Sequence, residues 1–161
     1  MDRAVEFSEF VATRGDGLVR TAALLLGRAD GAEDLVQDAL LRLYRHWDRV
    51  TRDGDPDAYL HRIMANLVVD GWRRKRPVVS VASVPDVAEA ADESLAQRDV
   101  VLRALAQLGR RQRAALVLRY WHDWSVERTA ETLGCSTGNV RALTSNGLAR
   151  LRALLDEEAL Q

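Results

Sequence analysis

An amide, a carboxylate and a guanidinium group follow one another along one face of a predicted helix in the middle of the chain. Asn66 and Asp70 are four residues apart, and Arg73 or Arg74 follows three or four residues later, so a helix places them on one side. The amide and the carboxylate can form hydrogen bonds with base edges, whereas arginines can hold phosphates. This spacing favours contact with nucleic acid.

An aromatic residue stands at the start of the basic run. Trp72 precedes Arg73, Arg74, Lys75 and Arg76, and four adjacent cations are more than a solvated helix end requires. An indole face can stack on an unpaired base. The same indole can instead pack into a core, and the sequence leaves both interpretations open.

A second candidate site lies near the C-terminus. Ser125 and Ser136 can each cap a helix, and Gly134 can form the turn between them, which is the pattern of a helix-turn-helix. In this motif the second helix enters the major groove, where its early exposed residues reach base edges. These residues are Thr137, Asn139, Arg141 and Ser145. Capped helices joined by glycine also occur in ordinary bundles, but the net charge of +6 over residues 100–155 favours DNA.

A third group of side chains is typical of a protein-binding surface. Asp30 and Glu33 resemble a capping box at the start of a helix. The following residues form two adjacent faces of this helix, separate from its apolar stripe: Glu33, Gln37 and Leu41 on one, and Asp34 and Asp38 on the other. A mixed acidic and apolar surface suits a protein partner. The alternative is a solvated helix face whose first carboxylates favour the helix dipole.

The elements that position these sites are all predicted to be helices. Every long segment has helical periodicity, and none alternates convincingly as a strand, so the fold class is all-α. The first two helices are expected at about 2–13 and 16–27, the second ending at Gly27. Trp121 and Trp124 are expected in the core.

The helices are predicted to form two small domains. Residues 78–92 lack a helical stripe and contain Pro85, which indicates a flexible linker, and the surrounding residues 78–99 carry a net charge of −4. The expected domains are residues 1–77 and 93–156, joined by this acidic linker.

Composition argues against several other classes of protein. His46, His61 and His122 are far apart in sequence without nearby ligands, so we expect them at surface or boundary positions and predict no metal site. Cys135 is the single cysteine and cannot form an internal disulfide. No nucleophile, phosphate loop or paired carboxylates stand out, so we expect neither catalysis nor a cofactor. The absence of a long apolar run predicts no membrane insertion and a cytoplasmic location.

Three stretches of the sequence together resemble the extracytoplasmic-function (ECF) sigma factors of bacterial RNA polymerase, which belong to the sigma-70 family, in an actinobacterial form. Residues 33–44 (EDLVQDALLRLY) are similar to the helix that binds core polymerase. Residues 59–76, with Asn66 and Asp70, are similar to the promoter-melting region, and residues 108–120 lead into the helix-turn-helix. The matches cover nearly the whole chain in the family's order.

The resemblance implies a transcription initiation factor built from a sigma region 2 bundle (1–77) and a sigma region 4 helix-turn-helix (93–156). The first domain would bind the beta-prime clamp of core polymerase and open the minus-ten element. The second would bind the beta flap and the minus-thirty-five element. Polymerase binding is implied for Glu33, Asp34, Gln37, Asp38 and Leu41, and minus-ten contact for Asn66, Asp70, Trp72, Arg73, Arg74 and Lys75. An anti-sigma factor is a further implied partner.

The recognition helix departs from the family pattern. Ala142, Leu143 and Asn146 stand where polar or basic contacts are common, and Gly147 lies in mid-helix, at a cost of roughly 1 kcal/mol relative to alanine. Reading of the minus-thirty-five element is therefore expected to be weak, unusual or assisted. Leu143 is expected either to contact a thymine methyl group or to pack against the next helix, and we favour packing. A stand-alone helix-turn-helix regulator and a sigma-derived helical adaptor remain the alternatives.

Overall fold

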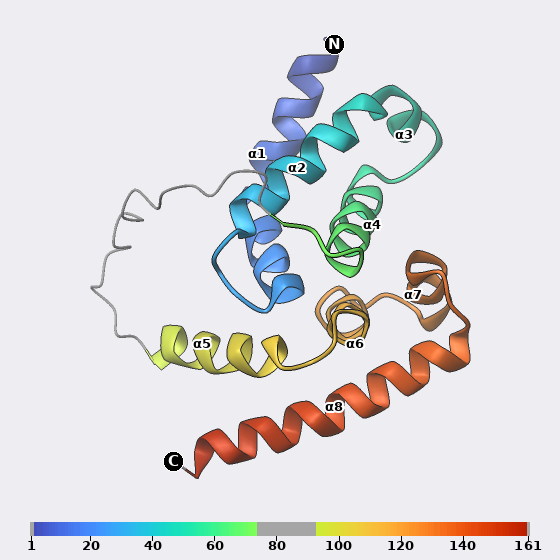
Figure 1. The fold of residues 1–161 in the computed structure, drawn as a ribbon. Helices are drawn as coiled ribbons and strands as arrows, with labels where there is room; N and C mark the ends of the chain where they lie inside the picture. The colour runs from blue at the N-terminus through green and yellow to red at the C-terminus, as the bar shows by residue number, and fades with distance from the viewer. Residues whose placement is uncertain (1, 74–92, 161) are drawn as a thin grey trace.

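The computed structural model describes residues 2–73 and 93–160, and all the regular elements in these two ranges are helices (Figure 1). The all-α prediction is confirmed. The linker assigned to 78–92, and Arg74 and Lys75, lie outside the described residues. The first half contains the helices α1 (Arg3–Leu26), α2 (Ala32–Arg45), α3 (Trp47–Asp53) and α4 (Pro56–Val69).

Helix α1 is one continuous helix, so the prediction of two helices at about 2–13 and 16–27 was wrong. Gly15 lies in the predicted gap and Gly17 just after it, but each costs only roughly 1 kcal/mol in a helix interior. The buried residues Phe10, Leu18 and Leu25 lie on both sides of the glycines and anchor one helix to the core. Tertiary packing therefore outweighs the local preference.

The helix ends of the first half follow their local chemistry with one exception. Gly27 ends α1 in the left-handed region at φ 72°, as predicted. Asp55 caps α4, where its side chain accepts a hydrogen bond from the Asp57 N–H. The capping box predicted at Asp30 is not formed, because Gly31, at φ 87°, is the residue that precedes α2.

The second half contains α5 (Glu93–Ala106), α6 (Arg110–Leu116), η1 (Val117–Trp121), α7 (Val126–Leu133) and α8 (Thr137–Ala159). The segment η1 is a π-helical turn that continues α6. Trp124 is buried as expected, but Trp121 is 53% exposed, so its assignment to the core was wrong. The π-helical turn changes the angle between successive side chains, which an α-helical period cannot anticipate.

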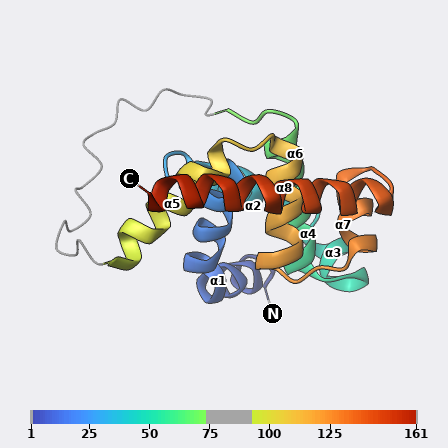
Figure 2. The ribbon, with the colours of Figure 1, turned by 90° about the horizontal axis from the view of Figure 1, so that it is seen from below.

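The two halves of the chain pack against each other. In two perpendicular views α6 lies next to α1 and α4 (Figures 1 and 2). One cluster of buried side chains runs from Leu25 and Leu60 in the first half to Ala115 and Leu118 in the second. A smaller apolar cluster, around Leu105, packs α5 and α6 against α8. The sequence left this arrangement open, and the structure describes a closed chain.

Candidate nucleic-acid interface

Asn66 and Asp70 of α4 line one surface groove of about 330 Å³. Asn66 is half-buried and Asp70 is exposed. The groove is completed from α2, whose Arg42 and Arg45 face the same space beside His46. An amide and a carboxylate therefore lie beside two guanidinium groups, which is the combination that base edges and phosphates require. Neither arginine was indicated by the sequence, since only the packing of α2 against α4 brings them here.

Trp72 is held in place by its backbone and by its side chain. Gly71, at φ 91°, reverses the chain after α4, and the Trp72 backbone N–H donates to the Leu67 carbonyl at 2.8 Å. The indole N–H donates to Asp38 Oδ2, also at 2.8 Å. The half-buried ring packs against the core, so the core interpretation holds for this conformation.

The face of α2 that we assigned to polymerase is largely exposed. Glu33 and Gln37 are exposed, and Leu41 is one of the most exposed large apolar residues, at 64%. Asp34 is half-buried. Asp38 differs from its neighbours, because its carboxylate accepts hydrogen bonds from Trp72 and, at 3.1 Å, from Arg42 Nε.

The helix-turn-helix forms as its sequence predicted. The Ser125 hydroxyl accepts from the Arg128 N–H, the Ser136 hydroxyl accepts from the Asn139 N–H, and Gly134 is left-handed at φ 66°. The residues proposed to reach bases lie at the start of α8: Asn139, Arg141 and Ser145 are exposed, and Thr137 is half-buried. Leu143 packs against the core, as expected.

A buried arginine ties the two halves together. Arg113 of α6 is 7% exposed, and its Nε donates to the Leu25 carbonyl of α1 at 2.6 Å. One terminal nitrogen donates to the carbonyls of Leu105 and Leu108 at 3.2 and 3.1 Å. Burial lowers the pKa of Arg113, and the cations of Arg28 and Arg110 lower it further. Three carbonyls offset part of the cost of burying this charge.

Two histidines that are distant in sequence meet at the same junction. The His61 and His122 rings are 4.1 Å apart between centroids, and His122 Nε2 lies 3.2 Å from the Thr21 hydroxyl. His61 is buried, with Nδ1 2.7 Å from the Asp57 carbonyl, so its assignment to a surface or boundary position was wrong. The pKa of His122 is lowered to about 4, mainly by burial and also by the charge of His61, while Asp57 opposes the shift.

The fold and its polar faces define a protein with two helical nucleic-acid-binding modules, and comparison with known proteins makes that class specific. Residues 10–78 match sigma-70 region 2, and residues 98–151 match sigma-70 region 4. The chain is 39% identical over 158 residues to the RNA polymerase sigma-E factor of Streptomyces avermitilis, covering 97% of this chain and 88% of the relative. It is 33% identical over 143 residues to the ECF RNA polymerase sigma factor SigM of Mycobacterium tuberculosis, covering 86% and 71%.

The chain therefore belongs to the ECF sigma factors of the sigma-70 family. Members of this family are transcription factors rather than enzymes.

Solved structures share the fold. The sigma factor RpoE of Bartonella quintana, in complex with the anti-sigma factor NepR, aligns with a TM-score of 0.67 at 24% identity, covering 94% of this chain and 97% of RpoE. CnrH, in complex with the cytosolic domain of CnrY, aligns with a TM-score of 0.63 at 28% identity, covering 94% and 88%. No helix among the described residues is long and apolar enough to cross a bilayer.

Proposed function

We propose that this sigma factor binds core RNA polymerase, directs it to a set of promoters and opens them without catalysis of its own. The observation that carries the proposal is the groove in which Asn66 and Asp70 lie beside Arg42 and Arg45. This groove combines base-reading and phosphate-binding groups next to the exposed face of α2, as a factor that contacts DNA and polymerase together requires.

The residues divide between the two partners. We assign Glu33, Gln37 and Leu41 to the beta-prime clamp, with Asp34 and Asp38 beside them. Asn66, Asp70, Trp72 and the basic run from Arg73 are assigned to the minus-ten element. The second domain is assigned to the beta flap and, through Thr137, Asn139, Arg141 and Ser145, to the minus-thirty-five element. The boundaries 1–77 and 93–156 are part of this proposal, as is action in the cytoplasm, where polymerase works.

The closed chain must open to serve both promoter elements. Elements centred about 25 base pairs apart are separated by roughly 85 Å of duplex, at about 34 Å per helical turn. A compact chain of this length has a radius of gyration of only about 15 Å. We infer that polymerase binding separates the two halves, and that an anti-sigma factor keeps the chain from polymerase. Support for the second point comes from RpoE, whose solved complex contains an anti-sigma factor.

Reconstituted transcription tests the proposal. Purified chain is added to core polymerase on fragmented genomic DNA, and transcript starts are mapped. Promoter-specific starts are expected. Asn66→Ala with Asp70→Ala should abolish open complexes, detected by permanganate reactivity of unpaired thymines, while polymerase binding persists. Arg62→Ala, an exposed change on the same helix, is the matched control and should initiate normally.

Two other results identify the alternatives. Operator binding without polymerase, at half-sites about one helical turn apart, would indicate a stand-alone helix-turn-helix regulator. Polymerase binding with no effect of the double substitution on DNA opening would indicate an adaptor. Failure to bind core polymerase contradicts the proposal altogether.

A further inference from the structure

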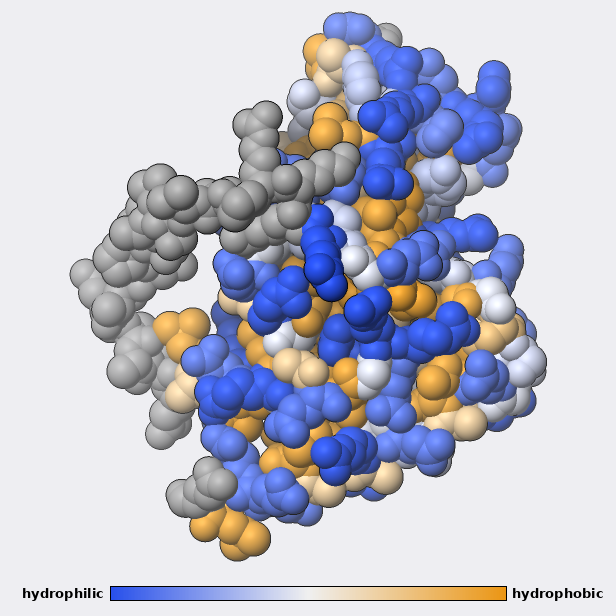
Figure 3. All heavy atoms as spheres, viewed as in Figure 1, coloured by the Kyte–Doolittle hydropathy of each residue, from blue (hydrophilic) through white to orange (hydrophobic). Residues whose placement is uncertain are grey.

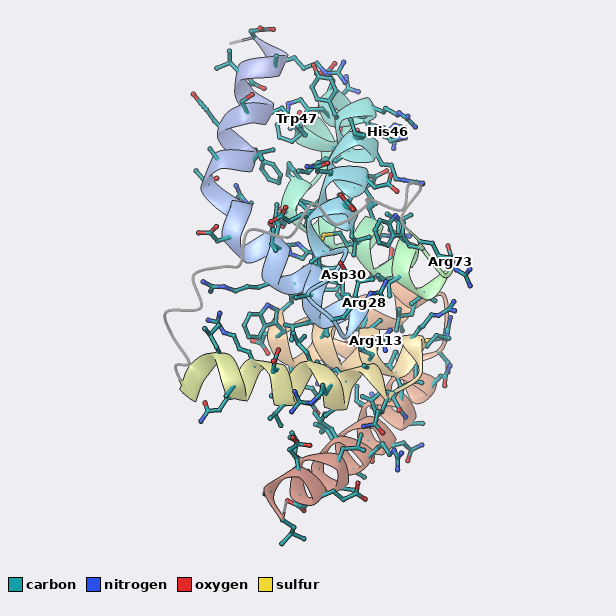
Figure 4. The ribbon with its side chains drawn as sticks, turned by 60° about the vertical axis from the view of Figure 1, so that its left-hand side comes forward. Arg28, Asp30, His46, Trp47, Arg73 and Arg113 are labelled. Carbon is teal, nitrogen blue, oxygen red and sulfur yellow. The ribbon has the colours of Figure 1, made fainter. Side chains whose placement is uncertain are left out.

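A small cavity at the junction of the two halves is lined by four arginines. Its volume is about 160 Å³, and its lining includes Arg28, Arg73, Arg110 and Arg113 together with Trp72. None of the described residues that line it is acidic. Hydrophilic side chains gather across the middle of the face shown in Figure 3, over the junction. Figure 4 shows Arg28 close to Arg113 near the end of α1, and Arg73 at the end of α4.

The four arginines come from different parts of the chain. Arg28 directly follows α1 and Arg73 follows α4, whereas Arg110 and Arg113 belong to α6. The Arg110 guanidinium lies over Gly71, where an added Cβ would be 2.7 Å from it. The fold therefore brings two cations from each half to one small space.

Their charges are not neutralised within the part of the chain that the structure describes. Arg28, Arg73 and Arg110 make no side-chain hydrogen bond or ion pair with described residues. Nε and one terminal nitrogen of Arg113 donate hydrogen bonds to backbone carbonyls, and its other terminal nitrogen donates to no described residue. Asp30 lies near Arg28 in Figure 4 but does not line the cavity. Mutual repulsion thus opposes closure until an anion enters.

We propose that this cavity binds a small phosphorylated anion that presents one or two phosphoryl groups, such as pyrophosphate or the diphosphate of a nucleotide. Guanidinium groups bind phosphate oxygens through paired, charge-assisted hydrogen bonds, and several around one anion are selective for multiple negative charge. The cavity holds the volume of about five water molecules at roughly 30 Å³ each, which suits the phosphoryl groups and leaves any attached nucleoside outside.

Such a ligand links the two halves of the chain. It contacts Arg28 and Arg73 on one side and Arg110 and Arg113 on the other, and opening separates these pairs. A ligand that binds only the closed form shifts the population toward it. Anion binding does not depend on the proposed function, whereas its consequence for polymerase binding does.

The test titrates inorganic pyrophosphate into the full chain, with sodium chloride at matched ionic strength as the reference. Thermal unfolding and isothermal calorimetry are the readouts. We expect saturable binding near one per chain, and a rise in Tm of about 3–6 °C at ten times Kd. Arg28→Gln with Arg110→Gln changes two exposed cavity residues and should weaken binding at least tenfold. Arg62→Gln with Arg150→Gln, which removes the same charge from exposed sites outside the cavity, is the control and should bind normally.

Several outcomes would overturn the proposal. One is a rise in Tm with pyrophosphate no larger than that with chloride, and another is equal pyrophosphate binding by the Arg28/Arg110 variant. A third is tight binding of a short DNA duplex that pyrophosphate does not displace. The last result would make the cluster part of the DNA interface.

A separate pull-down on core polymerase should show weaker capture of wild-type chain, but not of the Arg28/Arg110 variant, when pyrophosphate is present. If calorimetry succeeds and this step fails, the anion site stands and its link to polymerase is wrong.

Discussion

At the scale of single residues, Asp38 has two tasks that compete. Its carboxylate accepts from the Trp72 indole at 2.8 Å and from Arg42 at 3.1 Å, and we propose the same residue for the polymerase face of α2. A polymerase group that takes Asp38 would release Trp72 from the core. The same residue could thus connect polymerase binding with exposure of an aromatic ring beside the minus-ten groove.

The first prediction concerns the Asp38–Trp72 bond. Trp72→Phe keeps an aromatic ring and removes the N–H donor, and Asp38→Ala removes the acceptor. Each should lower the free energy of unfolding by about 1–2 kcal/mol, and the double variant should lose about 1 kcal/mol less than the sum, because both remove one charge-assisted bond. Urea unfolding measures these values. Glu33→Ala combined with Trp72→Phe is the control pair, and its two losses in free energy of unfolding should add. Additive losses for Asp38→Ala and Trp72→Phe would disprove the bond.

The second prediction concerns pH. The His122 pKa, about 4 in the closed chain, lies below its ordinary value of 6.5 because of burial and then His61. An opened or unfolded chain therefore binds the proton more readily, so this contribution to stability is complete above pH 6.5 and is lost as pH falls toward 4. The Tm of the wild type should fall more steeply over this range than that of His122→Gln. Equal slopes would contradict the assignment.

The residues of the groove and of the histidine pair show what the sequence could not provide. Asn66 and Asp70 were recognised because both lie on one helix, where spacing determines the face. Arg42, Arg45 and the pair of histidines were not recognised as neighbours, because each meeting depends on how separate helices pack. His61 and His122 are 61 residues apart in the chain and touch only in the closed fold.

At the scale of elements, the crossing of α6 and α8 depends on a glycine. Gly147 is buried in the middle of α8, and an added Cβ would lie 2.9 Å from Gln112 Cγ and 3.0 Å from Leu116 Cδ1. The sequence suggested only a weak point in a helix. In the structure, the absence of a side chain at Gly147 leaves room for α6 to pack closely against α8.

The third prediction follows from this crossing. Gly147→Ala should lower the free energy of unfolding by up to about 2 kcal/mol, because overpacking outweighs the roughly 1 kcal/mol gained in helix propensity. Gly17→Ala is the matched control. It lies inside α1 with nothing within 4 Å of an added Cβ, so it should raise stability by about 0.5–1 kcal/mol. Denaturant unfolding compares the two; stabilisation by Gly147→Ala would show that α6 and α8 are not so close.

Helix type and most helix ends could be predicted, whereas breaks and bends could not. Ser125, Ser136 and Gly134 carry local signals that the structure follows. The continuity of α1 through Gly15 and Gly17 depends instead on burial at both of its ends. The exposure of Trp121 depends on the π-helical turn, for which the sequence offers no periodic signal.

At the scale of the whole molecule, the closed chain holds the two faces that we propose for DNA binding in one compact body. The shared core, Arg113 and the histidine pair hold the halves together, while the four arginines of the cavity oppose closure. Such a balance of a few kcal/mol is easily shifted by a partner that prefers one state. Polymerase, an anti-sigma factor and a phosphorylated anion would act on the same equilibrium.

The fourth prediction concerns the distance between the two halves. If polymerase binding opens the closed chain, this distance must increase. Glu9→Cys and Arg152→Cys, both at exposed positions on opposite halves, carry a fluorophore pair in a chain with Cys135→Ser. Single-molecule energy transfer should give one distance in the free chain, that of the closed fold. In promoter-bound holoenzyme the distance should grow by roughly 40 Å or more. A transcribing holoenzyme in which the distance of the free chain persists would contradict the proposed opening.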